Sequence, residues 1–113
     1  MTYFAVIREA GPGWTDGKAT TEQPDVNDHS GFMNGLAADG FVLFAGPLAG
    51  TEEGRLRALL IVAAETEAEI GRRLANDPWA LTERLQITSI EPRTILVGAQ
   101  RLRSARPATG AVA

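Results

Sequence analysis

The stretch DHSGFMNGLAADGFVLFAGPL, residues 28–48, joins an expected helix to an expected strand and sets the fold. Side chains that can face a core recur at helical spacing in its first half and form one stripe of a helix. The stripe consists of His29, Phe32, Met33, Leu36 and Ala37. Gly40 follows, and glycine tolerates the left-handed conformation in which helices commonly end. The apolar run Phe41–Leu48 then predicts a strand that is buried on both faces.

The residues before this stretch predict a strand, a long loop and a helix cap. Thr2–Arg8 is rich in aromatic and β-branched residues and predicts the first strand. Gly11–Pro24 is polar and rich in glycine and proline, which predicts a loop of the length found in lids and binding loops. Trp14 within it either attaches the loop to the body or belongs to a lid. Asp25 is the expected N-cap, its carboxylate accepting from the first helical turn.

The residues after it predict two further strands and a second helix. Leu56–Ala64 is apolar on both sides and should form a hairpin with the strand before it. Thr66 and Glu69 fit a capping box for a helix that runs to about Asn76, where an Asp-Pro pair ends it and a short helical turn follows. Gln86–Val97 predicts the last strand, and Pro92 requires an edge position or a bulge there.

The predicted order of elements is therefore β-α-β-β-α-β, the ferredoxin-like arrangement of the α+β class with a four-stranded antiparallel sheet. Two helices would cover one face of that sheet. The apolar character of the second and third strands on both sides then requires a cover for the other face, and a second copy of the same sheet is the simplest one. We expect one domain over residues 1–99, a homodimer packed through its sheet faces, and a flexible tail over residues 100–113.

Composition excludes several classes of function. The chain has 113 residues, a net charge of −3 and no clustered basic patch in its body, so we expect no nucleic-acid partner. No apolar run approaches the roughly 20 residues of a membrane span, and the N-terminus lacks the features of a signal peptide, so we expect a soluble cytoplasmic protein. One histidine and no cysteine cannot form the usual zinc site, and phosphate-loop and dinucleotide motifs are missing. We expect neither a metal nor a cofactor.

The single histidine, His29, lies on the apolar stripe of the first helix, where both ring nitrogens need partners. The positive end of the helix disfavours the imidazolium, whereas a carboxylate in contact favours it. That balance suits proton transfer. The alternative is a core histidine whose hydrogen bonds are purely structural.

Several of these residues together resemble the YciI-like (YCII-related) family. The resemblance rests on His29, the Phe-Met pair that follows it, Ala45-Gly46-Pro47-Leu48 and Asp77-Pro78-Trp79, and it spans roughly residues 3–97. It implies a dimeric α+β barrel and an active site built on a histidine–aspartate pair, here His29 and Asp77. The chemistry it implies is ill-defined, with dehydrochlorination of a chlorinated aromatic suggested for one branch.

Both members of this predicted site also have plain structural interpretations. Asp77 before a proline is a standard helix start, and a carboxylate can cap a helix and orient an imidazole at once.

The remaining candidate site residues are expected to contact a small organic ligand. They are Phe32, Gly46, Pro47, Trp79 and Trp14. The leading hypothesis is a cofactor-free lyase, isomerase or hydrolase that uses His29 as general acid or base. The alternative is a dimeric ligand-binding or accessory protein without catalysis.

Overall fold

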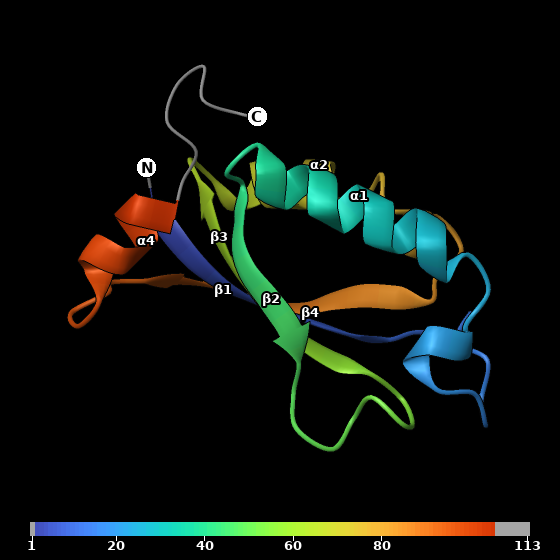
Figure 1. Cartoon of the computed structure of the whole chain (residues 1–113). Helices are drawn as coiled ribbons and strands as arrows, with labels where there is room; N and C mark the ends of the chain where they lie inside the picture. The colour runs from blue at the N-terminus through green and yellow to red at the C-terminus, as the bar shows by residue number, and fades with distance from the viewer. Residues whose placement is uncertain (1, 106–113) are drawn as a thin grey trace.

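The computed structural model describes residues 2–105, which form a four-stranded sheet with its two main helices on one side (Figure 1). The predicted sequence of elements is present, with short additional helices. The elements in chain order are β1 (Thr2–Ala10), the 3-10 helix η1 (Thr20–Glu22), α1 (Val26–Ala38), β2 (Val42–Pro47), β3 (Arg57–Ala64), α2 (Glu67–Leu74), α3 (Pro78–Leu81), β4 (Leu85–Arg93) and α4 (Ala99–Ala105).

The sheet has the order β2-β3-β1-β4, and every neighbouring pair is antiparallel. This is the predicted ferredoxin-like arrangement, and β2 and β3 form the predicted hairpin. Pro92 pairs with Phe4 on β4, which is an edge strand, as the missing N–H of proline requires. A bulge between Ile7 and Arg8 shifts the register of β1 against β4 just before the site described below.

The core lies between the sheet and the helices α1 and α2. Alternate residues of a strand face opposite sides, and in β1 the buried positions are Phe4, Val6 and Arg8. Phe4 and Val6 pack with Leu36 of α1 and with Ile70 and Leu74 of α2. The third residue on this face is a buried arginine, which is unusual enough to need a partner.

The helix caps agree with the sequence in position but not in every bond. Thr66 accepts from the Glu69 amide at 3.1 Å, as predicted, while Glu69 reaches back to the Glu65 amide at 2.8 Å. Asp25 is the N-cap of α1, but the prediction that its carboxylate caps the helix is wrong. Its backbone is left-handed with φ 62°, which turns the side chain away from the first turn and to 3.6 Å from Arg84.

The sheet face away from the helices is only partly covered by the described residues 2–105. The prediction that both strands of the hairpin are buried on both faces holds for most of β3 but not for β2, since the Phe44 side chain is 53% exposed. Phe44 pairs with Ile61, which in turn pairs with Ala5, so these residues share the face opposite Phe4 and Val6.

The C-terminal segment contains a short helix. Residues 99–105 form α4, since alanine, glutamine, arginine and leucine all favour a helix, so the predicted flexible tail over residues 100–113 begins within a helix. Residues 106–113 of the predicted tail lie outside the described residues. The last strand is also shorter than predicted and ends at Arg93, because the backbone leaves the sheet soon after Pro92.

Candidate active site

The site is built around Asp77, whose side chain is completely buried at the start of α3. Its carboxylate accepts from the Trp79 amide at 2.9 Å, so Asp77 is the N-cap of α3 and Pro78 occupies the first helical position. The same carboxylate binds two side chains that arrive from other elements. The local sequence therefore fixes where the carboxylate stands, and the fold decides what it meets.

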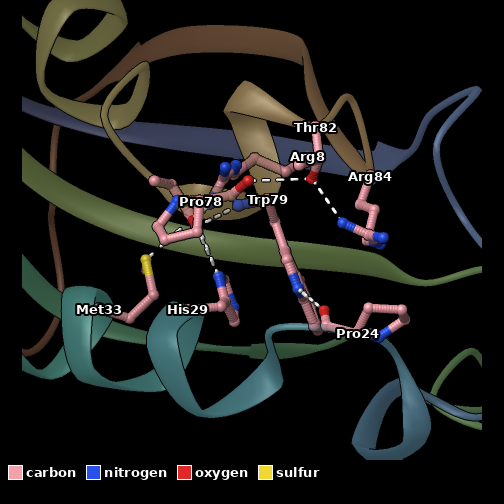
Figure 2. Close-up of polar contacts among 9 residues, drawn as sticks. Arg8, Pro24, His29, Met33, Pro78, Trp79, Thr82 and Arg84 are labelled. Atoms are coloured by element: carbon pink, nitrogen blue, oxygen red, sulfur yellow. Dashed lines mark hydrogen bonds and ion pairs between the residues drawn. The ribbon is translucent and has the colours of Figure 1, made fainter.

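His29 reaches Asp77 from the first turns of α1. Figure 2 shows the ring of His29 pointing from this helix toward Pro78, the residue that follows Asp77. Its Nδ1 lies 2.8 Å from Oδ2 and 3.0 Å from Oδ1 of Asp77. An ionised carboxylate can only accept, so Nδ1 is the donor and Nε2 of the neutral ring carries the lone pair. No hydrogen bond joins Nε2 to any residue of the described chain, and Nε2 lies across the ring from the aspartate.

Trp79 holds the imidazole ring from one side. The two rings are stacked with centroids 4.0 Å apart and planes 6° from parallel. The indole is itself fixed, because Nε1 donates to the Pro24 carbonyl at 2.7 Å and Trp14 packs edge-on at 5.7 Å. With Asp77 at one nitrogen and Trp79 on one face, the ring has little freedom to turn.

Arg8 of β1 is the third member of the group, and its side chain is buried. Its Nη1 donates to Asp77 Oδ2 at 2.9 Å and lies 3.8 Å from the Met33 sulfur. Arg8 and His29 thus contact the same carboxylate oxygen from two sides. A buried carboxylate with one cationic partner and two further hydrogen bonds is well compensated for its loss of water.

These contacts set the charge states. Burial raises the pKa of Asp77, but the hydrogen bond from His29, the charge of Arg8 and the hydrogen bond from the Trp79 amide outweigh it, so this pKa lies below its usual value. Burial lowers the pKa of Arg8, while Asp77 opposes the change. Arginine stays protonated at neutral pH even so. The core of the site is therefore an anion held between a cation and an imidazole.

A cavity of about 220 Å³ opens beside this group, between α1 and the β2–β3 hairpin. Its wall is mostly apolar, and His29 and Arg8 are the ionisable groups of the Asp77 cluster that line it. The other lining residues are Thr20, Met33, Ala45, Gly46, Pro47, Glu52, Leu56, Ala58, Leu60 and Leu85. A mostly apolar cavity with a few convergent polar groups is typical of a small-molecule site.

The structure brings together some of the predicted ligand contacts and not others. His29, Gly46 and Pro47 line the cavity, and Asp77 lies directly behind His29. Trp79 supports His29 from outside the cavity wall. Phe32 packs partly buried against the core, and Trp14 lies in a second apolar cluster with Trp79, Leu56 and Leu85.

The long loop from Gly11 to Pro24 is packed tightly where it leaves β1. A Cβ on Gly13 would stand 2.0 Å from the Thr82 carbonyl oxygen, so only glycine fits there. The buried side chain of Gln23 links two parts of the loop by hydrogen bonds. Its Oε1 accepts from the Thr15 amide, and its Nε2 donates to the carbonyls of Thr15 and Lys18. These contacts favour the interpretation of Trp14 as an anchor of the loop.

Sequence reasoning missed Arg8 and the role of Gln23 in linking the loop. The signal for Arg8 was available, because Phe4, Val6 and Arg8 are alternate residues of one strand and must share a face. An arginine that continues a buried apolar face needs a buried acidic partner. Nothing in the spacing of Gln23 indicates its role, which depends on how the loop folds over it.

Among residues 2–105, no group of three or more histidine, cysteine, aspartate or glutamate side chains is arranged to hold a metal ion. Within the same residues, no helix combines the length and apolar character needed to cross a membrane.

Comparison with known proteins supports the fold. No protein-family model and no curated protein sequence matches the chain. A similar solved structure is 5-chloro-2-hydroxyhydroquinone dehydrochlorinase (TftG) from Burkholderia phenoliruptrix AC1100, in complex with 2,5-dihydroxybenzoquinone. It has a TM-score of 0.53 and 18% sequence identity, over 87% of this chain and 97% of that chain. At this identity the likeness shows the shared α+β fold and leaves the chemistry to be argued from the site.

Proposed function

We propose that this protein is a cofactor-independent enzyme of YciI-like type, a lyase, isomerase or hydrolase that moves a proton with the His29–Asp77 pair. The observation that carries the proposal is the position of His29: one nitrogen is held by a buried carboxylate, and the ring lines an apolar cavity. A purely structural histidine would be expected to use both nitrogens within the core. The dehydrochlorinase with the same fold is consistent with chemistry on a small ring compound.

In this mechanism Nε2 of His29 takes a proton from the bound molecule. The C–H or O–H bond breaks, the Nε2–H bond forms, and the electron pair stays on the substrate. Asp77 stabilises the imidazolium across the 2.8 Å contact with Nδ1 and keeps the ring in the reactive tautomer. The proton then returns at another atom in an isomerase, or passes to a leaving group in a lyase.

The test is His29→Gln, because the glutamine amide can still donate to Asp77. Aromatic lactones and chlorinated phenols are screened with the purified protein, and turnover is followed by NMR in deuterated solvent. We expect the variant to lose turnover while its unfolding free energy changes by at most about 1.5 kcal/mol, the upper value for a stacked aromatic pair. The exposed neighbour on the same helical turn supplies the control, Asp28→Asn, which should retain full turnover. Unchanged turnover in His29→Gln refutes the proposal.

The alternative function is a ligand-binding or accessory protein without catalysis. It is favoured if small ring compounds bind in the cavity but no proton exchange above the solvent background is detected. The apolar wall of the cavity serves either function, so binding alone does not separate them.

We infer further that the protein is a homodimer through the face of the sheet opposite the helices. Half-exposed Phe44 and partly buried Leu59 and Ile7 lie on this face, and Phe44 and Ile61 also border a groove beside Leu102 of α4. An apolar sheet face of this kind is commonly covered by a second sheet.

A further inference from the structure

Arg8 has donors that its partners in the protein do not use. A guanidinium carries five N–H groups. Both hydrogen bonds that Arg8 makes within the described chain are donated by Nη1, to Asp77 and to Met33. Its Nε is buried without a hydrogen-bond partner, and no bond to Nη2 is present among the same residues. A buried donor without a partner, such as this Nε, is rare in folded proteins and calls for an explanation.

Arg8 is also part of the wall of the cavity that His29 lines. The two side chains are tied to the same Asp77 oxygen, at 2.9 Å and 2.8 Å. A ligand that places one atom near His29 therefore also lies close to the guanidinium. The other charged residue of the cavity wall is Glu52, which is exposed in the β2–β3 loop, whereas Arg8 is buried in strand β1.

The size and lining of the cavity limit what can bind. An apolar cavity of about 150 Å³ holds benzene, and this one has about 220 Å³. One ring with a few substituents therefore fits. The apolar wall suits the ring itself, and a negatively charged oxygen is the group that would satisfy the spare donors of a buried arginine.

We propose that Arg8 is a substrate-binding residue that holds the phenolic or enolic oxygen of a single-ring substrate as an anion while His29 exchanges the proton. This rests on the proposed function and names its substrate class. For a phenol, the O–H bond breaks, the proton forms the Nε2–H bond of His29, and the electron pair remains on the oxygen beside Arg8. Asp77 is then the counter-ion of both Arg8 and the protonated His29. The new negative charge, on the phenolate oxygen, lies on the side of Arg8 opposite Asp77.

The test compares two probes of nearly equal shape, 4-nitrophenol at a pH where it is the phenolate and the neutral 4-nitroanisole. Binding is measured by calorimetry for the unmodified protein and for Arg8→Met, Arg8→Lys and His29→Gln. Hydrogen bonds to charged groups predict that the unmodified protein prefers the phenolate by roughly 10- to 100-fold. Arg8→Met should lose that preference while its affinity for 4-nitroanisole changes by less than about threefold.

The ratio of the two affinities distinguishes the loss of a contact with Arg8 from a distorted cavity, since a distorted cavity weakens the binding of both probes alike. Arg8→Lys retains the charge but not the fork of donors, so it should keep only part of the preference. It also carries the test if Arg8→Met does not fold. An unchanged preference in either variant, or no preference in the unmodified protein, overturns the proposal. Turnover is a separate readout: a phenolate preference without any proton transfer would refute the proposed function and the proton exchange by His29, and would leave only the anion-binding role of Arg8 standing.

Discussion

Replacing Asp77 by asparagine should destabilise the protein far more than its small change in size suggests. Asparagine keeps a carbonyl oxygen that can still accept from the Trp79 amide. It removes the negative charge between Arg8 and His29 and places an N–H₂ group where two donors now converge. The guanidinium is then left buried without a counter-charge.

The magnitude follows from the burial of the pair. The side chains of Arg8 and Asp77 are 2% and 0% exposed, so water cannot replace the lost partner. Removing one member of such a pair costs about 3–5 kcal/mol. The total free energy of unfolding of a domain of this size is about 5–15 kcal/mol. We therefore expect Asp77→Asn to fold at 25 °C but to lose a large share of its stability.

The assay is urea unfolding followed by tryptophan fluorescence, since Trp14 and Trp79 are both buried. Asp39→Asn is the matched control, because Asp39 pairs with Arg73 at the surface and should cost less than about 1 kcal/mol. The double variant Arg8→Met with Asp77→Asn should lose less than the sum of the single losses, because their charges are coupled. A loss below about 1 kcal/mol for Asp77→Asn, or additive losses in the double variant, would refute the reasoning.

The pH dependence gives an independent check on the same carboxylate. The pKa of Asp77 is lower in the folded chain than in the unfolded one, so the folded state favours the ionised form. The stabilisation by the ionised Asp77 carboxylate is complete above its pKa in the unfolded chain, about 3.9. It is lost as the pH falls through the lower pKa of the folded chain. The stability gap between the unmodified protein and Asp77→Asn should thus narrow on acidification. A gap that stays constant from neutral to acidic pH would contradict this assignment.

Two further predictions concern the open sheet face and the C-terminus. Phe44→Asp should convert the expected dimer to a monomer in light scattering at micromolar concentration, whereas Leu81→Asp, at an exposed position of α3, should leave the mass unchanged; a monomeric unmodified protein would remove the basis for a sheet-to-sheet dimer. Truncation after Gln100 should lower the melting temperature by no more than a few degrees, because Leu102 and Val112 are the large apolar side chains lost; a much larger drop would mean that α4 is an integral part of the core.

Local signals in the sequence were enough to predict the fold. The helical spacing from His29 to Leu36, the capping pair Thr66 and Glu69, and the break at Pro78 each depend on residues a few positions apart. Such patterns report the geometry of one helix or strand, and the order β-α-β-β-α-β then leaves few arrangements. Asp25 shows the limit of local patterns, because its cap bond failed through a left-handed backbone that the spacing does not reveal.

The site depended on tertiary structure. His29 and Asp77 are 48 positions apart, and Arg8 lies 69 positions from Asp77, so no local pattern joins them. The resemblance to a family suggested the first pair, but not Arg8. Three elements, β1, α1 and α3, must pack before one carboxylate meets both an arginine and an imidazole. The sequence by itself determined the helices, the strands and the position of Asp77 at a helix start. Only the packing of these elements decided that this carboxylate would be buried between Arg8 and His29 beside a cavity, because burial and charge pairing are properties of the folded chain.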